Sequence, residues 1–401
     1  MSREHELLAQ IRATPDDDGP RAIVADVLAE RGDPRGEFIH LQLENSDDDE
    51  RDTREELLLR RFARQWSHDA GVRDARVSFR RGFPVALAGS PETLLASEAA
   101  LITQPITELI LDEVPFHQAA QLRRLIEHPA LERIRRLRIA PGPYDQPADG
   151  LVRLWRSDLP ALRTLELSAR TLSDSTVSAL VEAPWFAQLE RLALDRVPIT
   201  PSQLPRMFDA LPKLQALDLR AMRVGPAVAS RLAGIRAPLT RLYLDATELT
   251  VDGARAIFGS PIMRNLERLA IGHDHLQLSV DTLAAQSYLG RLRMLGLFEA
   301  RLAPADAQAI ATGPFEELVE LNLTGNNIGA AGARALAESE TLRSVTALYL
   351  TANTIGADAL DQFRTRSGLP ALAKLGGYGT IADEPWAETK ARFDRSAIKL
   401  V

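Results

Sequence analysis

The residues best able to bind a metal ion are a pair of histidines and two short acidic runs. His273 and His275 are two residues apart, so on an extended strand both would face the same side and could hold zinc. They follow a strand, however, and lie in a turn without an evident third ligand. The runs Asp16–Asp18 and Asp47–Asp49 could attract Mg²⁺ or Ca²⁺, but they lack the spaced oxygen ligands of an EF-hand loop. We therefore predict no metal site and interpret both runs as solvated loops.

A basic cluster that could bind phosphate or RNA occurs in one short segment, at Arg133, Arg135, Arg136 and Arg138. Acidic neighbours such as Asp112 and Glu166 balance it, so we interpret the cluster as a solvated edge. The formal net charge of the chain is −7, which does not favour binding to nucleic acid or to an anionic membrane. The prediction is that neither is a partner.

The sequence lacks the common motifs of enzymes. It contains no G-x-S-x-G, no H-E-x-x-H and no Gly-Lys dipeptide, and the last absence removes a phosphate-binding loop. It also contains no cysteine, which excludes disulfides, thiolate zinc sites and cysteine nucleophiles, and which fits a reducing compartment. We predict that the chain is not an enzyme and uses no cofactor.

Nothing in the sequence predicts a membrane protein. A spanning helix needs about 20 apolar residues, and no apolar run approaches that length. The first six residues lack the pattern of a signal peptide. The expected location is the cytoplasm.

The remaining candidates could recognise another macromolecule, because aromatic side chains among arginines are typical of binding hot spots. Affinity would come from four large side chains: Tyr243, Phe298, Met294 and Tyr349. Selectivity would come from four charged ones: Arg241, Arg268, Asp218 and Asp245. Three small residues, Ala270, Gly272 and Gly296, would leave a low floor between them. These residues can act together only if a repeated element places them on one surface.

Residues 317–329 contain that element. They read E-L-V-E-L-N-L-T-G-N-N-I-G, which matches the L-x-x-L-x-L-x-x-N-x-I signature of leucine-rich repeats. Leu321 and Leu323 alternate with Asn322, so both leucines face one side of a short strand. The amide of Asn326 can hydrogen-bond the backbone of adjacent turns. A single unit cannot bury its apolar side alone, whereas stacked parallel units can.

Leucine or isoleucine pairs recur along the chain at steps of 25 to 28 residues: Leu109/Leu111, Leu137/Ile139, Leu165/Leu167, Leu192/Leu194, Leu217/Leu219, Leu242/Leu244, Leu269/Ile271, Leu295/Leu297, Leu321/Leu323 and Leu348/Leu350. Residues 80–87 are expected to add an opening strand, and Leu372 with Leu375 a closing one. The turn asparagine is retained only at Asn326 and Asn353, so the other turns are expected to be relaxed versions of the same bend.

The step length also predicts what connects the strands. Steps of 25 to 28 residues leave room for a helix of two to three turns, and segments such as 252–258 and 329–337 are rich in helix formers. Ser173, Thr200 and Ser279 lie where N-caps are needed. The predicted fold is an α/β leucine-rich-repeat solenoid: a right-handed horseshoe with a parallel inner sheet and outer helices, preceded by a small all-helical N-terminal domain.

Four N-terminal helices are expected, over residues 3–13, from about residue 20 to a cap at Gly32, from Pro34 onward, and over about 53–66. Here residues 15–21 read P-D-D-D-G-P-R and residues 25–39 read A-D-V-L-A-E-R-G-D-P-R-G-E-F-I.

These two segments resemble the bacterial repeat-companion domain, a small domain that precedes repeats in proteins of myxobacteria and planctomycetes. The match covers about 45 residues and departs from the family at Val27, where tryptophan is usual. The resemblance implies a bacterial repeat protein and brings no catalytic activity with it.

We therefore predict three regions: a helical repeat-companion domain over 1–75, an array of about ten repeats over 76–375, and a C-terminal capping helix over 376–401. The predicted function is a protein-interaction scaffold that binds a protein or peptide on its concave face. The alternative is a regulator of a small GTPase, suggested by similarity of the repeats to those of the Ran GTPase-activating protein.

Overall fold

The computed structural model describes residues 3–44, 49–112, 119–140, 151–169, 172–273, 280–286, 289–365, 368–377, 393 and 398–400. The chain divides into two compact units, which we call unit 1 (Met1–Leu189) and unit 2 (Glu190–Val401). Each unit is described by itself. Among the described residues, no helix is both long enough and apolar enough to cross a membrane.

Unit 1 begins with four helices: α1 (Arg3–Ala13), α2 (Gly19–Glu30), α3 (Pro34–Leu43) and α4 (Asp49–Asp69). All four were predicted. Gly32 ends α2 at φ +70°, and the N–H groups of Gly32 and Asp33 donate to the carbonyls of Ala29 and Leu28. This is the pattern of a Schellman cap, for which glycine is preferred. Helices α2 and α3 touch at Gly36, where a Cβ would lie 2.6 Å from the Ala29 nitrogen.

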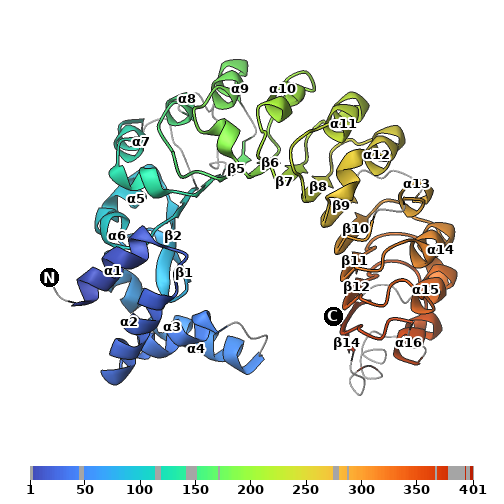
Figure 1. Ribbon diagram of the computed structural model, residues 1–401, viewed down its shortest axis with the longest axis horizontal. Helices are drawn as coiled ribbons and strands as arrows, with labels where there is room; N and C mark the ends of the chain where they lie inside the picture. The colour runs from blue at the N-terminus through green and yellow to red at the C-terminus, as the bar shows by residue number, and fades with distance from the viewer. Residues whose placement is uncertain are drawn as a thin grey trace. The chain divides into compact units, whose positions relative to one another are not determined.

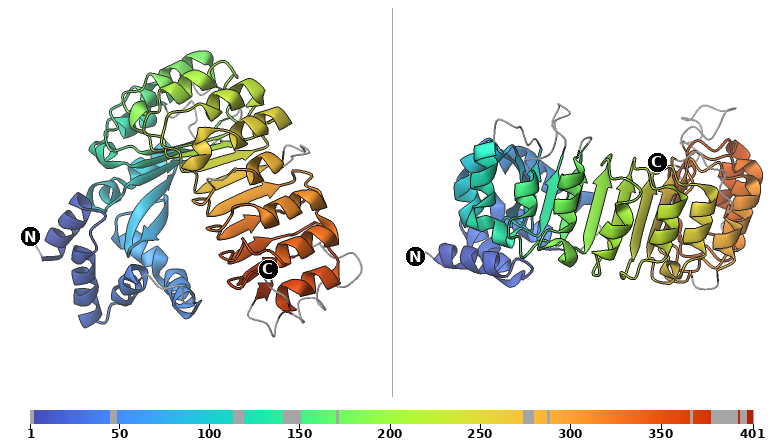
Figure 2. Two further views of the ribbon diagram at one scale, coloured as in Figure 1. Left: turned by 45° about the vertical axis from the view of Figure 1, so that its right-hand side comes forward. Right: turned by 90° about the horizontal axis from the view of Figure 1, so that it is seen from above.

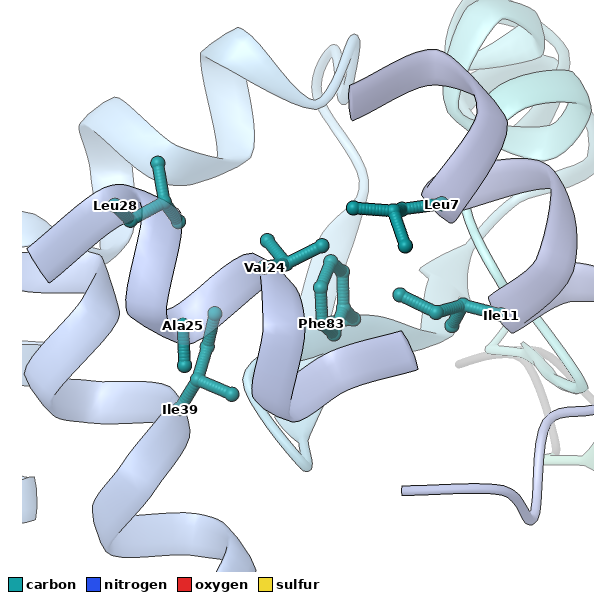
Figure 3. Close-up of a cluster of buried hydrophobic side chains, with 7 residues drawn as sticks. All are labelled: Leu7, Ile11, Val24, Ala25, Leu28, Ile39 and Phe83. Carbon is teal, nitrogen blue, oxygen red and sulfur yellow. The ribbon is translucent and has the colours of Figure 1, made fainter. Parts of the chain in front are cut away.

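Two apolar clusters stabilise the N-terminal helices. The first, shown in Figure 3, consists of Leu7, Ile11, Val24, Ala25, Leu28, Ile39 and Phe83. Phe83 belongs to the sheet, so this cluster packs the helices against it. The guanidinium groups of Arg21 and Arg35 lie 5.8 and 5.1 Å from the centre of the Phe83 ring, within the range of cation–π attraction. The second cluster is centred on Phe38, Leu58 and Trp66.

The sheet of unit 1 contains β1 (Arg76–Arg80), β2 (Phe83–Gly89), β3 (Glu108–Leu111), β4 (Arg136–Ile139) and β5 (Thr164–Ser168). Strands β1 and β2 form an antiparallel hairpin, and β2 to β5 are parallel in chain order. Its helices are α5 (Pro91–Ala96), α6 (Glu98–Thr103), α7 (Ala119–Ile126), α8 (Leu151–Trp155) and α9 (Asp174–Val181). The predicted opening strand began too early, because Arg81 and Gly82 have positive φ and form the hairpin turn.

The sheet of unit 2 is parallel, and its strands follow chain order: β6 (Arg191–Asp195), β7 (Ala216–Arg220), β8 (Arg241–Asp245), β9 (Arg268–Gly272), β10 (Met294–Phe298), β11 (Glu320–Asn322), β12 (Ala347–Tyr349), β13 (Lys374–Gly376) and β14 (Lys399–Leu400). Its helices are α10 (Leu204–Asp209), α11 (Gly225–Ala233), α12 (Val251–Phe258), α13 (Asp281–Ala284), α14 (Pro304–Thr312), α15 (Gly329–Ala337) and α16 (Ala357–Thr365). They lie on one face of the sheet, as Figures 1 and 2 show for the yellow-to-red repeats. We call the opposite face of each unit's sheet its inner face.

The ten predicted leucine pairs point into the core, and each member is at most 3% exposed. Burial of one such side chain contributes roughly 1.5–3 kcal/mol. The predicted role of the turn asparagine is also confirmed. The Asn326 Oδ1 accepts from the N–H groups of Ala300 and Leu302, both at 3.0 Å, and its Nδ2 donates to the carbonyls of Leu297 and Leu323. Asn326 therefore joins two successive repeats.

A residue in the left-handed backbone region follows most strands of unit 2: Arg196, Ala221, Ala246, His273, Glu299, Gly325 and Ala352. The conformation costs an L-residue about 1–2 kcal/mol. In return, the N–H of this residue reaches the next repeat. For example, the Ala246 N–H donates to the Gly272 carbonyl at 2.9 Å.

Smaller predictions had mixed outcomes. The Ser173 Oγ caps α9 by accepting from the Thr176 N–H at 3.2 Å. The prediction for Thr200 was wrong, because α10 begins after Gln203. Ser279 lies outside the described residues.

The predicted α/β leucine-rich-repeat solenoid, with a parallel inner sheet and outer helices, is confirmed. The closing strand exists as β13, and β14 beyond it was not predicted. Most of the predicted capping helix over 376–401 lies outside the described residues, although Phe393 within it is buried. The prediction was wrong at its two ends, because Gly376 belongs to β13 and Lys399–Leu400 form β14. The domain limits at residues 75 and 375 remain predictions, since the division at Leu189 does not test them.

Candidate functional site

The inner face of unit 2 is built from the strand residues that alternate with the buried leucines. Neighbouring strands pair in register, so equivalent positions form rows across the sheet. The row between the leucines contains Ala193, Asp218, Tyr243, Ala270, Gly296, Asn322 and Tyr349. The row before them contains Arg191, Ala216, Arg241, Arg268, Met294, Glu320 and Ala347. The row after them contains Asp195, Arg220, Asp245, Gly272 and Phe298. All eight predicted partner-binding residues are in these rows.

The rows bring some of the eight together. Arg241 pairs directly with Arg268, which pairs with Met294. Asp218 is opposite Tyr243 in the neighbouring strand. Tyr349, by contrast, lies on β12, two strands beyond β10, so it is separated from Met294 and Phe298 on the same face.

Phe298 lies across the floor that the two glycines were predicted to leave open. A Cβ built on Gly296 would be 2.7 Å from the Phe298 Cε1 atom, and one built on Gly272 would overlap the ring. The prediction of a hollow flanked by Phe298 was therefore wrong in this detail, because the ring itself covers the hollow. The two glycines leave a flat surface on which the partly exposed Phe298 ring rests.

Tyr349 has a similar seat. A Cβ on Gly376 of the next strand would be 2.8 Å from the Tyr349 Cδ1 atom. Both aromatic side chains are thus pre-positioned on the sheet by a neighbouring glycine. A fixed ring loses little conformational entropy when a partner covers it, which favours its use as an anchor.

The acidic residues of this face are engaged in a network. The Asp245 carboxylate lies 3.5 Å from the Arg220 guanidinium and also contacts the His273 Nδ1. Arg220 lies 3.8 Å from Asp218, and the His273 Nε2 lies 3.4 Å from Glu299. The His273 ring also packs 5.4 Å from that of Phe298, centre to centre. Arg220, His273 and Glu299 were not predicted as partner-binding residues, although His273 was considered as a metal ligand. Arg220 is the last residue of β7, and His273 and Glu299 directly follow β9 and β10, so their position at the end of a strand was the available signal.

Arg241 and Arg268 differ from these charges. Both are exposed, and neither forms a salt bridge with any residue that the structure describes. They are directly opposite each other in register, an arrangement of like charges that destabilises a sheet by several tenths of a kcal/mol, up to about 1. Two adjacent guanidinium groups can bind a carboxylate of another molecule.

The candidate metal ligands do not form a site in the described part of the chain. There, no group of three or more His, Asp or Glu side chains is placed to hold a metal ion. His275 lies outside the described residues, as do Asp47 and Asp48. Asp16 is paired with Arg135 at 2.7 Å, and the hydrogen bond from Arg135 lowers the pKa of Asp16.

Each arginine of the basic cluster at residues 133–138 contacts a carboxylate or a backbone carbonyl of unit 1. Arg133 is half-buried, and it donates to the carbonyls of Leu101 in α6 and of Ile106, which precedes β3. Burial lowers the pKa of Arg133. Arg136 contacts two carboxylates, and Arg138 lies 3.9 Å from Glu166. The four arginines are therefore tied into unit 1 and do not form a continuous uncompensated patch.

Comparisons with known proteins agree with this architecture. A family model described as leucine-rich repeat matches residues 318–337. No protein of curated function matches the sequence. A chain from the crystal structure of the yeast Rad7 and Elc1 complex is similar in structure, with a TM-score of 0.56, 14% identity, and coverage of 77% of this chain and 76% of that one. An internalin (inlF) from Listeria monocytogenes aligns with a TM-score of 0.42 at 16% identity, covering 76% of this chain and 75% of the other. The likeness to the yeast chain shows a shared repeat-solenoid fold.

Proposed function

We propose that this protein is a non-enzymatic scaffold that binds a protein or peptide on the inner face of unit 2. The observation that carries the proposal is the uncompensated pair Arg241 and Arg268 beside Met294, with the seated Phe298 ring on the same strand as Met294. An arrangement that weakens the free protein is expected to be retained where it strengthens a complex.

The residues divide into anchors and selectors. Tyr243, Phe298, Met294 and Tyr349 would contribute apolar contact area, and truncation of one central aromatic anchor typically costs 2 kcal/mol or more of binding free energy, as an order of magnitude. Arg241 and Arg268 would bind a carboxylate of the partner. The Asp218 and Asp245 network with Arg220 would instead reject acidic groups at β7 and β8. The partner segment is therefore apolar with an acidic group near β8 and β9.

The fold supports such a role. Stacked repeats expose a long continuous surface of strand residues, and their identity can vary without disturbing the leucine core. The similar yeast chain was crystallised in a complex of two proteins.

The test is affinity capture from a lysate by the tagged protein, with the captured proteins identified by mass spectrometry. The double variant Arg241→Glu, Arg268→Glu and the double variant Tyr243→Ala, Phe298→Ala are each expected to lose at least about tenfold of the captured partner. A matched control carries the same charge change on the helical side, at Arg206 of α10 and Arg334 of α15, both exposed.

Capture that survives both inner-face variants would place the binding surface elsewhere and refute the proposal. Loss of capture in the control as well would indicate a non-specific charge effect and count against it too. Regulation of a small GTPase, the alternative raised by the sequence, is tested separately by adding the protein to candidate GTPases and measuring GTP hydrolysis.

A further inference from the structure

The inner face of unit 1 contains a pocket of about 150 Å³ between the β1–β2 hairpin and strand β4. It is lined by Ser78, Phe79, Arg80, Val85, Ala86, Glu108, Leu109, Ile110, Arg136 and Arg138. Pockets for cofactors and drug-sized ligands are usually about 300–1,000 Å³, so this one has room for a single side chain rather than a cofactor.

The strand register explains which of these residues face the pocket. Ser78 pairs with Ala86, Ala86 with Glu108, and Glu108 with Arg136. In the next row Ile110 pairs with Arg138. The pocket therefore has a mixed lining on the inner face, with small and apolar groups in the middle and guanidinium groups on two sides.

The charges of the pocket are arranged by depth. The Glu108 carboxylate is only 14% exposed and is paired with Arg80 at 3.0 Å and Arg136 at 3.7 Å. Glu166, 16% exposed, is paired with Arg136 and, at 3.9 Å, with Arg138. The arginine side chains are 62% (Arg80), 41% (Arg136) and 56% (Arg138) exposed. The Glu108 carboxylate thus lies at the base of the pocket, Glu166 lies outside its lining, and the three cations are more exposed than the two anions.

We infer that this pocket binds the carboxylate of an acidic side chain from a peptide or protein segment. Arg80 contacts one carboxylate, that of Glu108, and Arg138 makes one long contact to Glu166, so both guanidinium forks retain N–H donors for an incoming carboxylate. The Ser78 hydroxyl is exposed at the rim and can donate a further hydrogen bond. Ala86 and Ile110 can contact the methylene groups of a glutamate. Recognition by paired arginines is directional, and lysine would not reproduce it.

This site is independent of the surface proposed on unit 2. Its residues all belong to unit 1, and its ligand is defined by one carboxylate and a short methylene stem. A failure of the capture experiment on unit 2 leaves the present inference standing, and the reverse also holds.

The test uses the full-length protein and fluorescein-labelled tetraglutamate, with labelled tetraglutamine as the neutral comparison, in fluorescence-anisotropy titrations. The informative variant is Arg80→Gln, Arg138→Gln. It should fold, because Arg136 remains beside both carboxylates. The matched single-charge control is Arg76→Gln, which removes a cation paired with Asp112 and outside the pocket lining. Arg138→Gln alone is compared with it.

Tetraglutamate should bind wild type, and tetraglutamine should not. Arg138→Gln should weaken binding at least about fivefold and the double variant at least about twentyfold, while Arg76→Gln should change it less than about twofold. Thermal unfolding by circular dichroism should show the same transition temperature within a few degrees for each variant.

Four results would overturn the inference. Tetraglutamate that fails to bind wild type, or that binds the double variant as tightly as wild type, would show that the pocket is not a carboxylate site. If millimolar inorganic phosphate displaces the peptide more strongly than chloride does at equal ionic strength, the pocket is a phosphate site. Tighter binding of an oligouridylate than of tetraglutamate, lost in the same variant, would reassign it to RNA.

Discussion

The seat of Phe298 on Gly296 can be tested by a double-mutant cycle. In Gly296→Ala the new Cβ would lie 2.7 Å from the Phe298 Cε1 atom, closer than carbon atoms approach, whereas its contact with the Ala270 Cβ at 3.3 Å is tight but tolerable. The flexible element is the ring, so the substitution should push Phe298 off the floor and into solvent. In a Phe298→Ala background the same Cβ meets no ring.

The expected size follows from the area that the ring covers. A phenylalanine side chain buries about 150–250 Å² when fully enclosed, and we take about 100 Å² of this as the area that the partly exposed Phe298 ring covers on the floor. At about 20–25 cal/mol per Å² the displaced ring loses about 2–2.5 kcal/mol. Replacing a strand glycine by alanine recovers about 0.5–1 kcal/mol of backbone entropy. Gly296→Ala should therefore destabilise wild type by about 1–2 kcal/mol, yet be neutral or stabilising in Phe298→Ala.

Urea unfolding of the four proteins, followed by far-UV circular dichroism, measures the cycle, and equal m-values are required for the comparison. The expected coupling between the two sites is about 2 kcal/mol, within the range measured for residues in contact. If Gly296→Ala costs the same free energy of unfolding in both backgrounds, the ring does not rest on this glycine. The account of a pre-positioned aromatic anchor would then fail with it.

Three further predictions concern the framework. Asn326→Ala should lower the free energy of unfolding in urea by about 3 kcal/mol, because it removes four hydrogen bonds to buried backbone groups. The control Asn322→Ala, on the inner face, should lower it by less than about 1 kcal/mol. Equal losses would refute the bridging role of Asn326. Gly36→Ala should destabilise unit 1 by about 3 kcal/mol, because the new Cβ would clash with the backbone of α2. Gly32→Ala should destabilise it by only about 1 kcal/mol, because alanine is strained at the positive φ of this position. Thermal unfolding compares the two variants, and a larger loss for Gly32→Ala would contradict the contact at Gly36. Burial lowers the pKa of His128 below its usual 6.5, and its Nδ1 accepts from the Ala130 N–H, so the folded protein favours neutral histidine. The stabilising contribution is complete above pH 6.5 and is lost as the pH falls from 6.5 towards the folded-state pKa. His128→Asn keeps a side-chain acceptor for the Ala130 N–H, and its free energy of unfolding in urea should fall less between pH 7 and pH 5 than that of wild type. If wild type and the variant show the same pH dependence, His128 is not the group responsible.

The scaffold was predictable because its signals are local and repeated. The alternation of Leu321 and Leu323 specifies a strand with one buried side, and the step between pairs leaves room for a helix. The bridging role of Asn326 followed from its amide chemistry alone. The cap at Gly32 likewise needed only the preference of glycine for positive φ.

The details of the inner face could not be predicted in the same way, because they depend on residues of adjacent repeats. Whether Phe298 stands beside the hollow or lies in it depends on the register of β10 against β9, which aligns Gly272 with Phe298. The left-handed residues were missed for a related reason. Local preference favours glycine there, but the hydrogen bond from the Ala246 N–H to the next repeat offsets the cost and allows other residues.

The pairing of charges across the strands distinguishes arginines that are held by carboxylates from arginines that no carboxylate of the described residues pairs. In unit 1 the row through Glu108 and Arg136 alternates in sign, and the partly buried carboxylates hold the arginines in place, while Arg80 and Arg138 keep N–H donors for a ligand. In unit 2 the row through Arg241 and Arg268 repeats one sign on adjacent strands. A row selected only for stability would alternate, since opposite charges across strands stabilise a sheet and like charges weaken it. Because Arg241 and Arg268 carry the same charge on adjacent strands, we expect an acidic group of the partner to bind there. This expectation depends on the inner-face charges and not on the leucines that form the core.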